Sequence, residues 1–189
     1  MNWFAADVKL GRKIQRNILF LNGKDLLFKN TWTAMTVYEM ICALLNDRKF
    51  IYRTVHHQPT YTSEESARAR GEDVSIGGKA IVMKIDEGFK LFVLSAKQKV
   101  DSKKLKEHFK AKSIRFATKE ELMELTGLVP GSVPPFGPPI LNIPLFLDPS
   151  ILANKKIAFN AGSLTDSVIM NTSDYLTVVD AEQFPFSQQ

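Results

Sequence analysis

Hydrophobic and polar residues follow helical spacing in three stretches of this chain, and each stretch begins with the same signal. The signal is a threonine with a glutamate three residues later, as at Thr36, Thr62 and Thr118. Such a capping box satisfies the free amides at the start of a helix. We therefore expect helices over residues 37–47, from 63 to a stop at Gly71, and from 119 to a stop at Gly127.

Runs rich in β-branched and aromatic residues predict strands between these helices. Residues 79–85 and 89–94 flank Asp86-Glu87-Gly88, which indicates a β-hairpin. Shorter strands are expected at 50–57, 114–117, 143–147, 157–160 and 168–170, with a last helical turn from Thr172. Helices and strands mix without regular βαβ spacing, so we expect an α+β fold with a mixed sheet and surrounding helices.

The N-terminal residues differ in charge from the rest of the chain. Residues 1–35 carry six lysines and arginines against two aspartates, and Asn22-Gly23 after an apolar run indicates a hairpin. We assign residues 1–35 to a basic extension, 36–182 to the main domain and 183–189 to a tail. With 189 residues, of which 44% are hydrophobic, the chain can bury a substantial core.

The composition excludes several classes of protein. No run of about eighteen apolar residues could span a bilayer, and no basic leader precedes an apolar segment at the N-terminus. We expect a cytoplasmic protein without a membrane partner. The single Cys42 lies on an apolar helical pattern and fits a core residue better than a nucleophile. His56 and His57 point to opposite faces of a predicted strand, so we expect no metal site.

Residues 97–112 are strongly basic, with seven lysines and only two acidic residues, Asp101 and Glu107. If Ser102 caps a helix over residues 103–110, Leu105 and Phe109 point inward. The opposite side then carries Lys103, Lys106 and Lys110. Two interpretations remain open for this stripe: a solvated helix face, or a surface that contacts a phosphate backbone.

Two further features are candidates for chemistry. The sequence Gly131-Ser132-Val133-Pro134-Pro135-Phe136-Gly137 predicts a rigid turn that cannot extend a helix or enter a sheet. It fits either a surface linker or a loop that holds backbone amides in place. Lys79 opens an apolar strand directly after two glycines. Its ammonium could be solvent-exposed without a ligand, or it could bind a phosphate or carboxyl oxygen.

An ordered set of motifs resembles the YbaK/prolyl-tRNA-synthetase-associated editing domain family. The resemblance covers about residues 37–180. Its blocks are Thr62-Ser63-Glu64-Glu65-Ser66-Ala67, Gly78-Lys79-Ala80-Ile81-Val82-Met83, the helix that ends at Thr126-Gly127, the Gly131 to Gly137 loop, and Asn160-Ala161-Gly162-Ser163 with Asp174-Tyr175-Leu176.

The resemblance implies a free-standing deacylase that hydrolyses the ester of mischarged aminoacyl-tRNA without a metal or cofactor. Lys79 would anchor the substrate near the terminal adenosine, and Gly131 would offer backbone donors. Pro135, Phe136 and Gly162 would shape or border the aminoacyl pocket. The expected partners are aminoacyl-tRNA and a synthetase, and no DNA.

One departure from the family concerns the run after Gly162, where Asp166 stands in Ser163-Leu164-Thr165-Asp166-Ser167. Asp166 either positions a water molecule in the substrate site or caps a turn. Two other functions remain open. One is a non-catalytic module of the same fold that binds tRNA or a synthetase, and the other is a small-molecule or protein-interaction domain.

Overall fold

The computed structural model describes residues 35–188 and confirms the α+β class. The predicted basic extension, with its hairpin at Asn22-Gly23, lies outside the described residues. The helices and strands are, in chain order, α1 (Val37–Asp47), β1 (Tyr52–His56), α2 (Ser63–Arg70), β2 (Gly78–Ile85), β3 (Gly88–Ser95), α3 (Ser102–Phe109), β4 (Ile114–Phe116), α4 (Lys119–Thr126), β5 (Leu145–Leu147), β6 (Lys156–Asn160), β7 (Asp166–Asn171), α5 (Thr172–Val178) and β8 (Ala181–Gln183).

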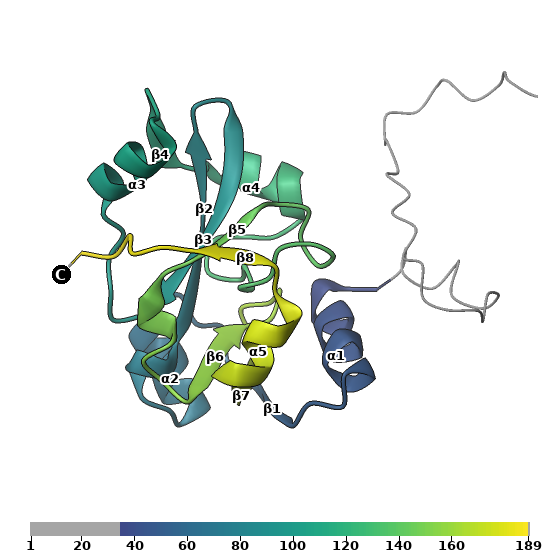
Figure 1. Ribbon diagram of the computed structural model, residues 1–189. Coiled ribbons are helices and arrows are strands. Elements are labelled where there is room, and N and C mark those ends of the chain that lie inside the picture. The colour runs from purple at the N-terminus through teal and green to yellow at the C-terminus, as the bar shows by residue number, and fades with distance from the viewer. Residues whose placement is uncertain (1–34, 189) are drawn as a thin grey trace, which may run out of the picture. The chain divides into compact units, whose positions relative to one another are not determined.

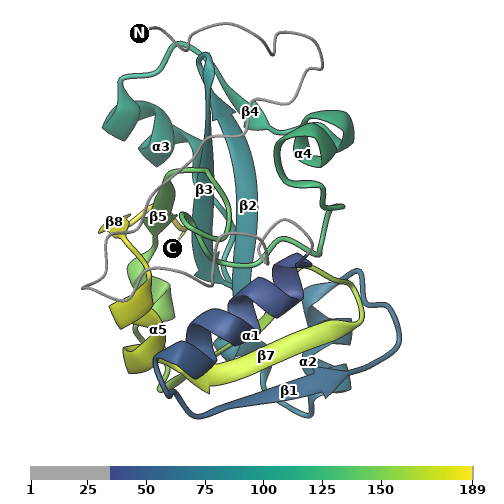
Figure 2. The same cartoon turned by 90° about the vertical axis from the view of Figure 1, so that its right-hand side faces the viewer.

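The strands form two sheets instead of the single mixed sheet that the sequence predicts. One sheet has the order β1-β7-β6 and is antiparallel; the other has the order β4-β2-β3-β5-β8. The hairpin of β2 and β3 is the longest antiparallel pair, and β5 joins β3 and β8 in parallel. Figure 2 shows this hairpin rising from the three-stranded sheet, with α3 on one side and α4 on the other.

The predicted capping boxes are confirmed at all three threonines. The hydroxyls of Thr36, Thr62 and Thr118 each accept a hydrogen bond from the amide of the glutamate three residues later. Gly71 and Gly127 end α2 and α4 with φ values of 68° and 71°, which side chains strongly disfavour. These local signals fix the direction of both helices relative to the strands.

The N-cap of α3 differs from the prediction by one residue. The side chain of Asp101, and not Ser102, accepts hydrogen bonds from the amides of Lys103 and Lys104. A carboxylate at this position also interacts favourably with the helix dipole. Leu105 is fully buried and Phe109 is half-buried, as predicted.

Two hydrophobic clusters cover opposite faces of the five-stranded sheet. Alternate residues of β2 point to opposite faces. Val82 belongs to the larger cluster with α1, α4 and the Gly/Pro loop, whereas Met83 and Ile85 belong to the smaller one with Leu105 of α3. Helix α3 and the Gly/Pro loop therefore lie on different sides of this sheet, as Figures 1 and 2 also show.

The segment assigned to a C-terminal tail is packed against the domain through residue 187. Phe186 is fully buried in the smaller cluster, where its ring contacts Phe92 at a centroid distance of 5.3 Å. The carboxylate of Asp148 accepts hydrogen bonds from the amides of Phe186 and Ser187, at 2.7 and 2.8 Å. No helix within residues 35–188 is long and apolar enough to cross a membrane.

Candidate functional site

A cavity of about 400 Å³ opens along the free edge of β2. Strand β4 pairs only with Met83, Lys84 and Ile85, and β6 meets this edge only through an isolated bridge between Gly77 and Ala158, so residues 79–81 have no paired strand on this edge. The walls come from α2, the start of β2, the end of β4, α4, the Gly/Pro loop and the end of β6. Segments far apart in the sequence thus meet in one place.

Lys79 and Gly131, the two residues predicted to be catalytic, both line this cavity. The ammonium of Lys79 donates a hydrogen bond to the carbonyl oxygen of Gln98 and is half-buried. Burial lowers the pKa of Lys79; Glu64 opposes this shift and Lys99 adds to it. The ammonium is therefore a cation held at the cavity by the backbone carbonyl of Gln98, and no carboxylate of the described residues forms an ion pair with it.

The Gly/Pro loop carries two backbone amides beside the cavity that have no hydrogen-bond partner among residues 35–188. Gly131 and Val133 both line it, and the amide of neither residue is hydrogen-bonded within the described part of the chain. Gly131 has a φ of 89°, and a Cβ there would stand 3.2 Å from Leu164 Cδ2. A side chain at Gly131 would therefore contact Leu164, which is not part of the cavity wall, and the positive φ would strain the loop.

Asn160 fixes the position of this loop. Its amide nitrogen donates to the carbonyl oxygen of Gly131 at 2.9 Å, and its oxygen accepts from Arg70 Nη2 at 2.6 Å and from Ser167 Oγ at 3.1 Å. These partners determine which way the amide faces. Asn160 thereby ties the loop to α2 and β7.

Arg70 is the most unusual residue of the cavity and was not identified from the sequence. It is only 7% exposed, although it carries a charge and lines the cavity. Its Nε donates to Ser167 Oγ at 2.9 Å and its Nη2 to Asn160, while Nη1 has no hydrogen-bond partner in residues 35–188. Burial lowers the pKa of Arg70 to about 10, so the guanidinium stays charged at neutral pH. Sequence offers no sign of this, since an arginine in the last turn of a helix is ordinary.

The rest of the cavity is divided between hydroxyl groups and apolar side chains. Thr60 and Ser66 are buried and share a hydrogen bond of 2.8 Å between their hydroxyls. Apolar wall comes from Val82, Leu122 and Val133. A ligand here would meet polar groups beside Arg70 and apolar surface along β2 and α4.

Three residues predicted to bind the substrate support the loop from behind and do not line the cavity. The carbonyl oxygen of Pro135 accepts a 2.6 Å hydrogen bond from the buried Tyr175 hydroxyl. Phe136 is 1% exposed, and its ring packs against those of Phe159 and Tyr175. Gly162 donates its amide to Ser132 and leaves no room for a Cβ against α1.

Asp166 also lies outside the cavity wall, at the first position of β7. Its carboxylate accepts a hydrogen bond from His56 Nδ1 at 2.7 Å and from the Thr165 hydroxyl at 2.9 Å. Burial would raise the pKa of Asp166, but the hydrogen bonds from His56, Ser163 and Thr165 lower it. These contacts fit the turn between β6 and β7 better than a water-positioning carboxylate.

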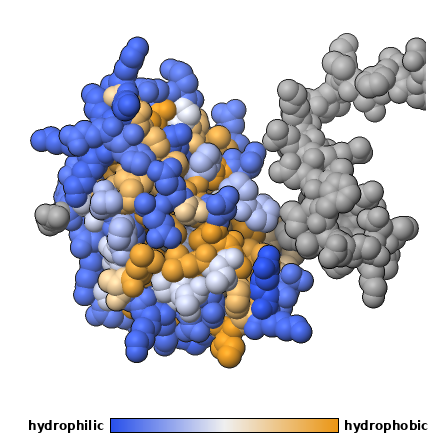
Figure 3. Space-filling view, in the orientation of Figure 1, coloured by the Kyte–Doolittle hydropathy of each residue, from blue (hydrophilic) through white to orange (hydrophobic). Residues whose placement is uncertain are grey.

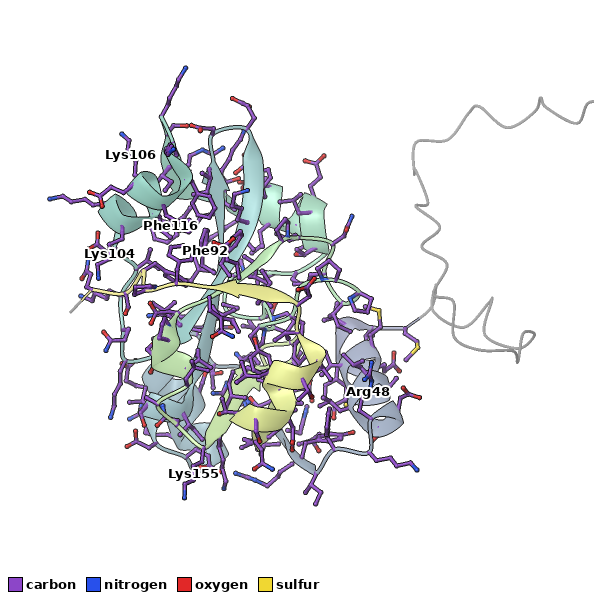
Figure 4. The ribbon with its side chains drawn as sticks, in the orientation of Figure 1. Arg48, Phe92, Lys104, Lys106, Phe116 and Lys155 are labelled. Carbon is purple, nitrogen blue, oxygen red and sulfur yellow. The ribbon has the colours of Figure 1, made fainter. Side chains whose placement is uncertain are left out.

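The predicted tRNA-binding lysines are exposed but are not part of the cavity. Lys103 and Lys106 lie on α3, and Lys110 ends it in the left-handed conformation. Figure 4 shows Lys104 and Lys106 on the side of the sheet away from α4, and in Figure 3 hydrophilic residues cover α3 while an apolar band lies over α5. Lys104 differs from its neighbours because its ammonium donates to the carbonyl oxygen of Ser187.

Comparisons with known proteins show which family the chain is similar to. A family model described as the aminoacyl-tRNA editing domain matches residues 57–178. Over 155 residues the chain is 34% identical to the multifunctional Ser/Thr-tRNA deacylase ProXp-y of Escherichia coli strain K12, which covers 79% of this chain and 92% of that protein. It is 32% identical over 100 residues to a proline–tRNA ligase of Shouchella clausii strain KSM-K16, covering 53% of this chain and 17% of the ligase. A crystal structure described as a trans-editing enzyme for prolyl-tRNA synthetase is 27% identical, with a TM-score of 0.70, and covers 81% of this chain and 98% of its own.

Proposed function

The chain belongs to the aminoacyl-tRNA editing domain family, and we propose that it is a trans-editing deacylase that hydrolyses the ester of mischarged aminoacyl-tRNA. One observation carries this proposal. Lys79 and the Gly131 loop, which are far apart in the sequence, line the same cavity. The cation and the free amides are thus available to one bound ester.

The chemistry needs no nucleophilic side chain. An aminoacyl ester is already activated, so a positioned water molecule can add to its carbonyl carbon. The carbon–oxygen bond to the ribose then breaks, the ribose oxygen takes a proton, and the free amino acid leaves. The amides of Gly131 and Val133 would stabilise the negative charge that develops on the carbonyl oxygen. Lys79 would hold an oxygen of the terminal nucleotide.

The polar end of the cavity favours a small hydroxylated amino acid. Arg70 Nη1 has a free donor, and the hydroxyls of Thr60 and Ser66 lie in the same wall. A substrate hydroxyl could satisfy these groups, whereas a methyl group of the same size would leave them without a partner. The name of the Escherichia coli relative, a Ser/Thr-tRNA deacylase, supports serine and threonine as substrates.

The remaining partners follow from this substrate. The lysines of α3 would contact the phosphate backbone of the tRNA beyond its acceptor end. The likeness to part of a proline–tRNA ligase supports association with a synthetase. Such a substrate places the protein in the cytoplasm and requires neither DNA nor a membrane.

A deacylation panel tests the proposal. The full chain is incubated with tRNA carrying serine, threonine, alanine, valine or proline, and release of the amino acid is followed against a no-enzyme control. We expect hydrolysis of the seryl and threonyl esters to be faster than that of the valyl ester. If the folded chain binds these tRNAs but hydrolyses none of them, it is the non-catalytic binding module instead.

A further inference from the structure

Two exposed aromatic rings stand at the mouth of the cavity. Tyr61 is 72% and Phe116 is 59% exposed, and both line the cavity. No other phenylalanine or tyrosine within residues 35–188 is exposed to this degree. Single exposed apolar residues are common on proteins. Here, however, the two exposed aromatic residues of the described chain border the same opening.

Both rings are carried by ordered backbone at different ends of that opening. The amide of Tyr61 donates to Glu65 Oε2 at 2.8 Å, beside the capping box that begins α2. Phe116 ends β4, in register with Met83 of β2. Strand β4 and helix α2 lie apart in both Figure 1 and Figure 2. A ligand that leaves the cavity would therefore pass two preformed aromatic surfaces.

Charges of both signs lie beside the opening. Lys97 forms an ion pair with Asp73 at 3.2 Å, and Glu64 and Lys99 both influence the ionisation of Lys79. Ala96 is part of the cavity wall, and Lys97 and Lys99 lie one and three residues after it. Surfaces that bind single-stranded nucleic acid usually combine aromatic rings with lysines, because the rings stack on the bases and the lysines bind the phosphates.

We propose that Tyr61 and Phe116 are stacking platforms for the unpaired bases at the 3′ end of the aminoacyl-tRNA. This inference rests on the proposed function, in which the ester at that end lies in the cavity. The residues beside Tyr61 on the rim are Thr62 and Ser63. Because the neighbours of Tyr61 are polar and Phe116 belongs to a different element, the two rings do not form the continuous apolar face that a protein partner would cover, and the rim suits two bases better.

The contribution of base stacking can be distinguished from that of ester hydrolysis by comparing two threonine esters, one with bases and one without. One is threonyl-tRNA, and the other is the 2-hydroxyethyl ester of threonine, which has no base. We expect Tyr61→Ala and Phe116→Ala each to lower kcat/KM on threonyl-tRNA by about five- to 150-fold more than on the simple ester. Tyr61→Phe and Phe116→Tyr should restore the rate. Ile51→Ala is the matched control, because Ile51 is 85% exposed but lies outside the cavity wall.

Binding of the tetranucleotide ACCA, labelled at its 5′ end and followed by fluorescence anisotropy, tests the rings without any hydrolysis. Loss of a ring should weaken binding by a similar factor without changing the slope of log Kd against log salt, since no phosphate contact is removed. Ring-dependent binding of ACCA would support the stacking surface even if the wild-type chain hydrolysed neither ester, a result that would overturn only the proposed function. Binding and kcat/KM that are the same in the alanine variants as in the wild type would overturn the stacking surface.

Discussion

Replacement of Arg70 by methionine separates the contribution of this residue to folding from its contribution to function. Burial lowers the pKa of Arg70 to about 10. This is roughly two and a half pKa units below the ordinary arginine value, at about 1.4 kcal/mol each, so burial of the charge destabilises the folded state by about 3 kcal/mol. No carboxylate in residues 35–188 forms an ion pair with Arg70 to offset this cost.

The hydrogen bonds of Arg70 act in the opposite direction. Each bond from a charged donor stabilises by about 1.5–3 kcal/mol. In Arg70→Met, the oxygen of Asn160 keeps its bond from Ser167 Oγ, and Ser167 keeps its contact with His57. The two effects nearly cancel, and we expect the free energy of unfolding to change by no more than about 2 kcal/mol in either direction. Loss of one charged bond to the substrate hydroxyl should lower kcat/KM on threonyl-tRNA by about 10- to 150-fold.

Urea denaturation followed by circular dichroism gives the stability, and deacylation of threonyl- and alanyl-tRNA gives the activity. Arg68→Met is the control, because Arg68 is an exposed residue of the same helix, and this variant should resemble the wild type in both assays. A loss of stability above about 3 kcal/mol with normal kcat/KM per folded molecule would refute the reasoning and make Arg70 a structural residue. Equal losses on both substrates would show that the guanidinium contacts a part of the substrate common to all aminoacyl-tRNAs.

Four further predictions use the same assays. Lys79→Ala should abolish most deacylation with little change in melting temperature. Because burial lowers the pKa of Lys79, wild-type activity, corrected for spontaneous hydrolysis, should fall as the pH rises toward the ordinary lysine pKa. In Lys79→Arg this fall should occur at a higher pH. Replacement of Lys103, Lys106 and Lys110 by glutamine should weaken tRNA binding and reduce the slope of log K against log salt by roughly 0.7–0.9 per lost contact. An unchanged slope would show that these lysines form a solvated helix face that does not contact the tRNA. Gly131→Ala should lower activity equally for every esterified amino acid, because strain at a φ of 89° moves the loop. A loss that grows with the size of the esterified amino acid would show instead that the alanine methyl group enters the cavity. Tyr175→Phe should lower the free energy of unfolding by about 1–3 kcal/mol, since the buried carbonyl of Pro135 loses its donor, and an unchanged urea midpoint would contradict this.

Local signals in the sequence predicted most of the helices and strands. A capping box joins residues only three positions apart, and a left-handed glycine depends on its own backbone. Such features need no knowledge of the tertiary structure. One error is also local: the sequence predicts the N-cap of α3 at Ser102, one residue after Asp101, which occupies it. The division into two sheets could not be predicted, since it depends on which strands pair.

Three cavity residues, Arg70, Tyr61 and Phe116, were missed for a different reason. Arg70 takes its importance from Ser167 and Asn160, which are 97 and 90 residues away in the sequence. Tyr61 and Phe116 are likewise ordinary residues until the fold brings them to one opening. Composition and spacing cannot reveal these residues, because their contacts in the cavity join segments that are far apart in the sequence. The family motifs contain Lys79, Gly131 and Asn160, but they do not contain Arg70, Tyr61 or Phe116.

A local signal nevertheless explains why the cavity exists. Strand β4 runs antiparallel to β2, and the amide of Ala117 still donates to the carbonyl oxygen of Val82. The capping box of Thr118 then turns the chain into α4, so pairing stops and the edge of β2 before Val82 remains open. An open strand edge is a site of unwanted pairing between chains unless it is covered or charged. In this protein the edge is bordered by α2 and the Gly/Pro loop and carries Lys79, so the features that protect the edge are also those that form the site.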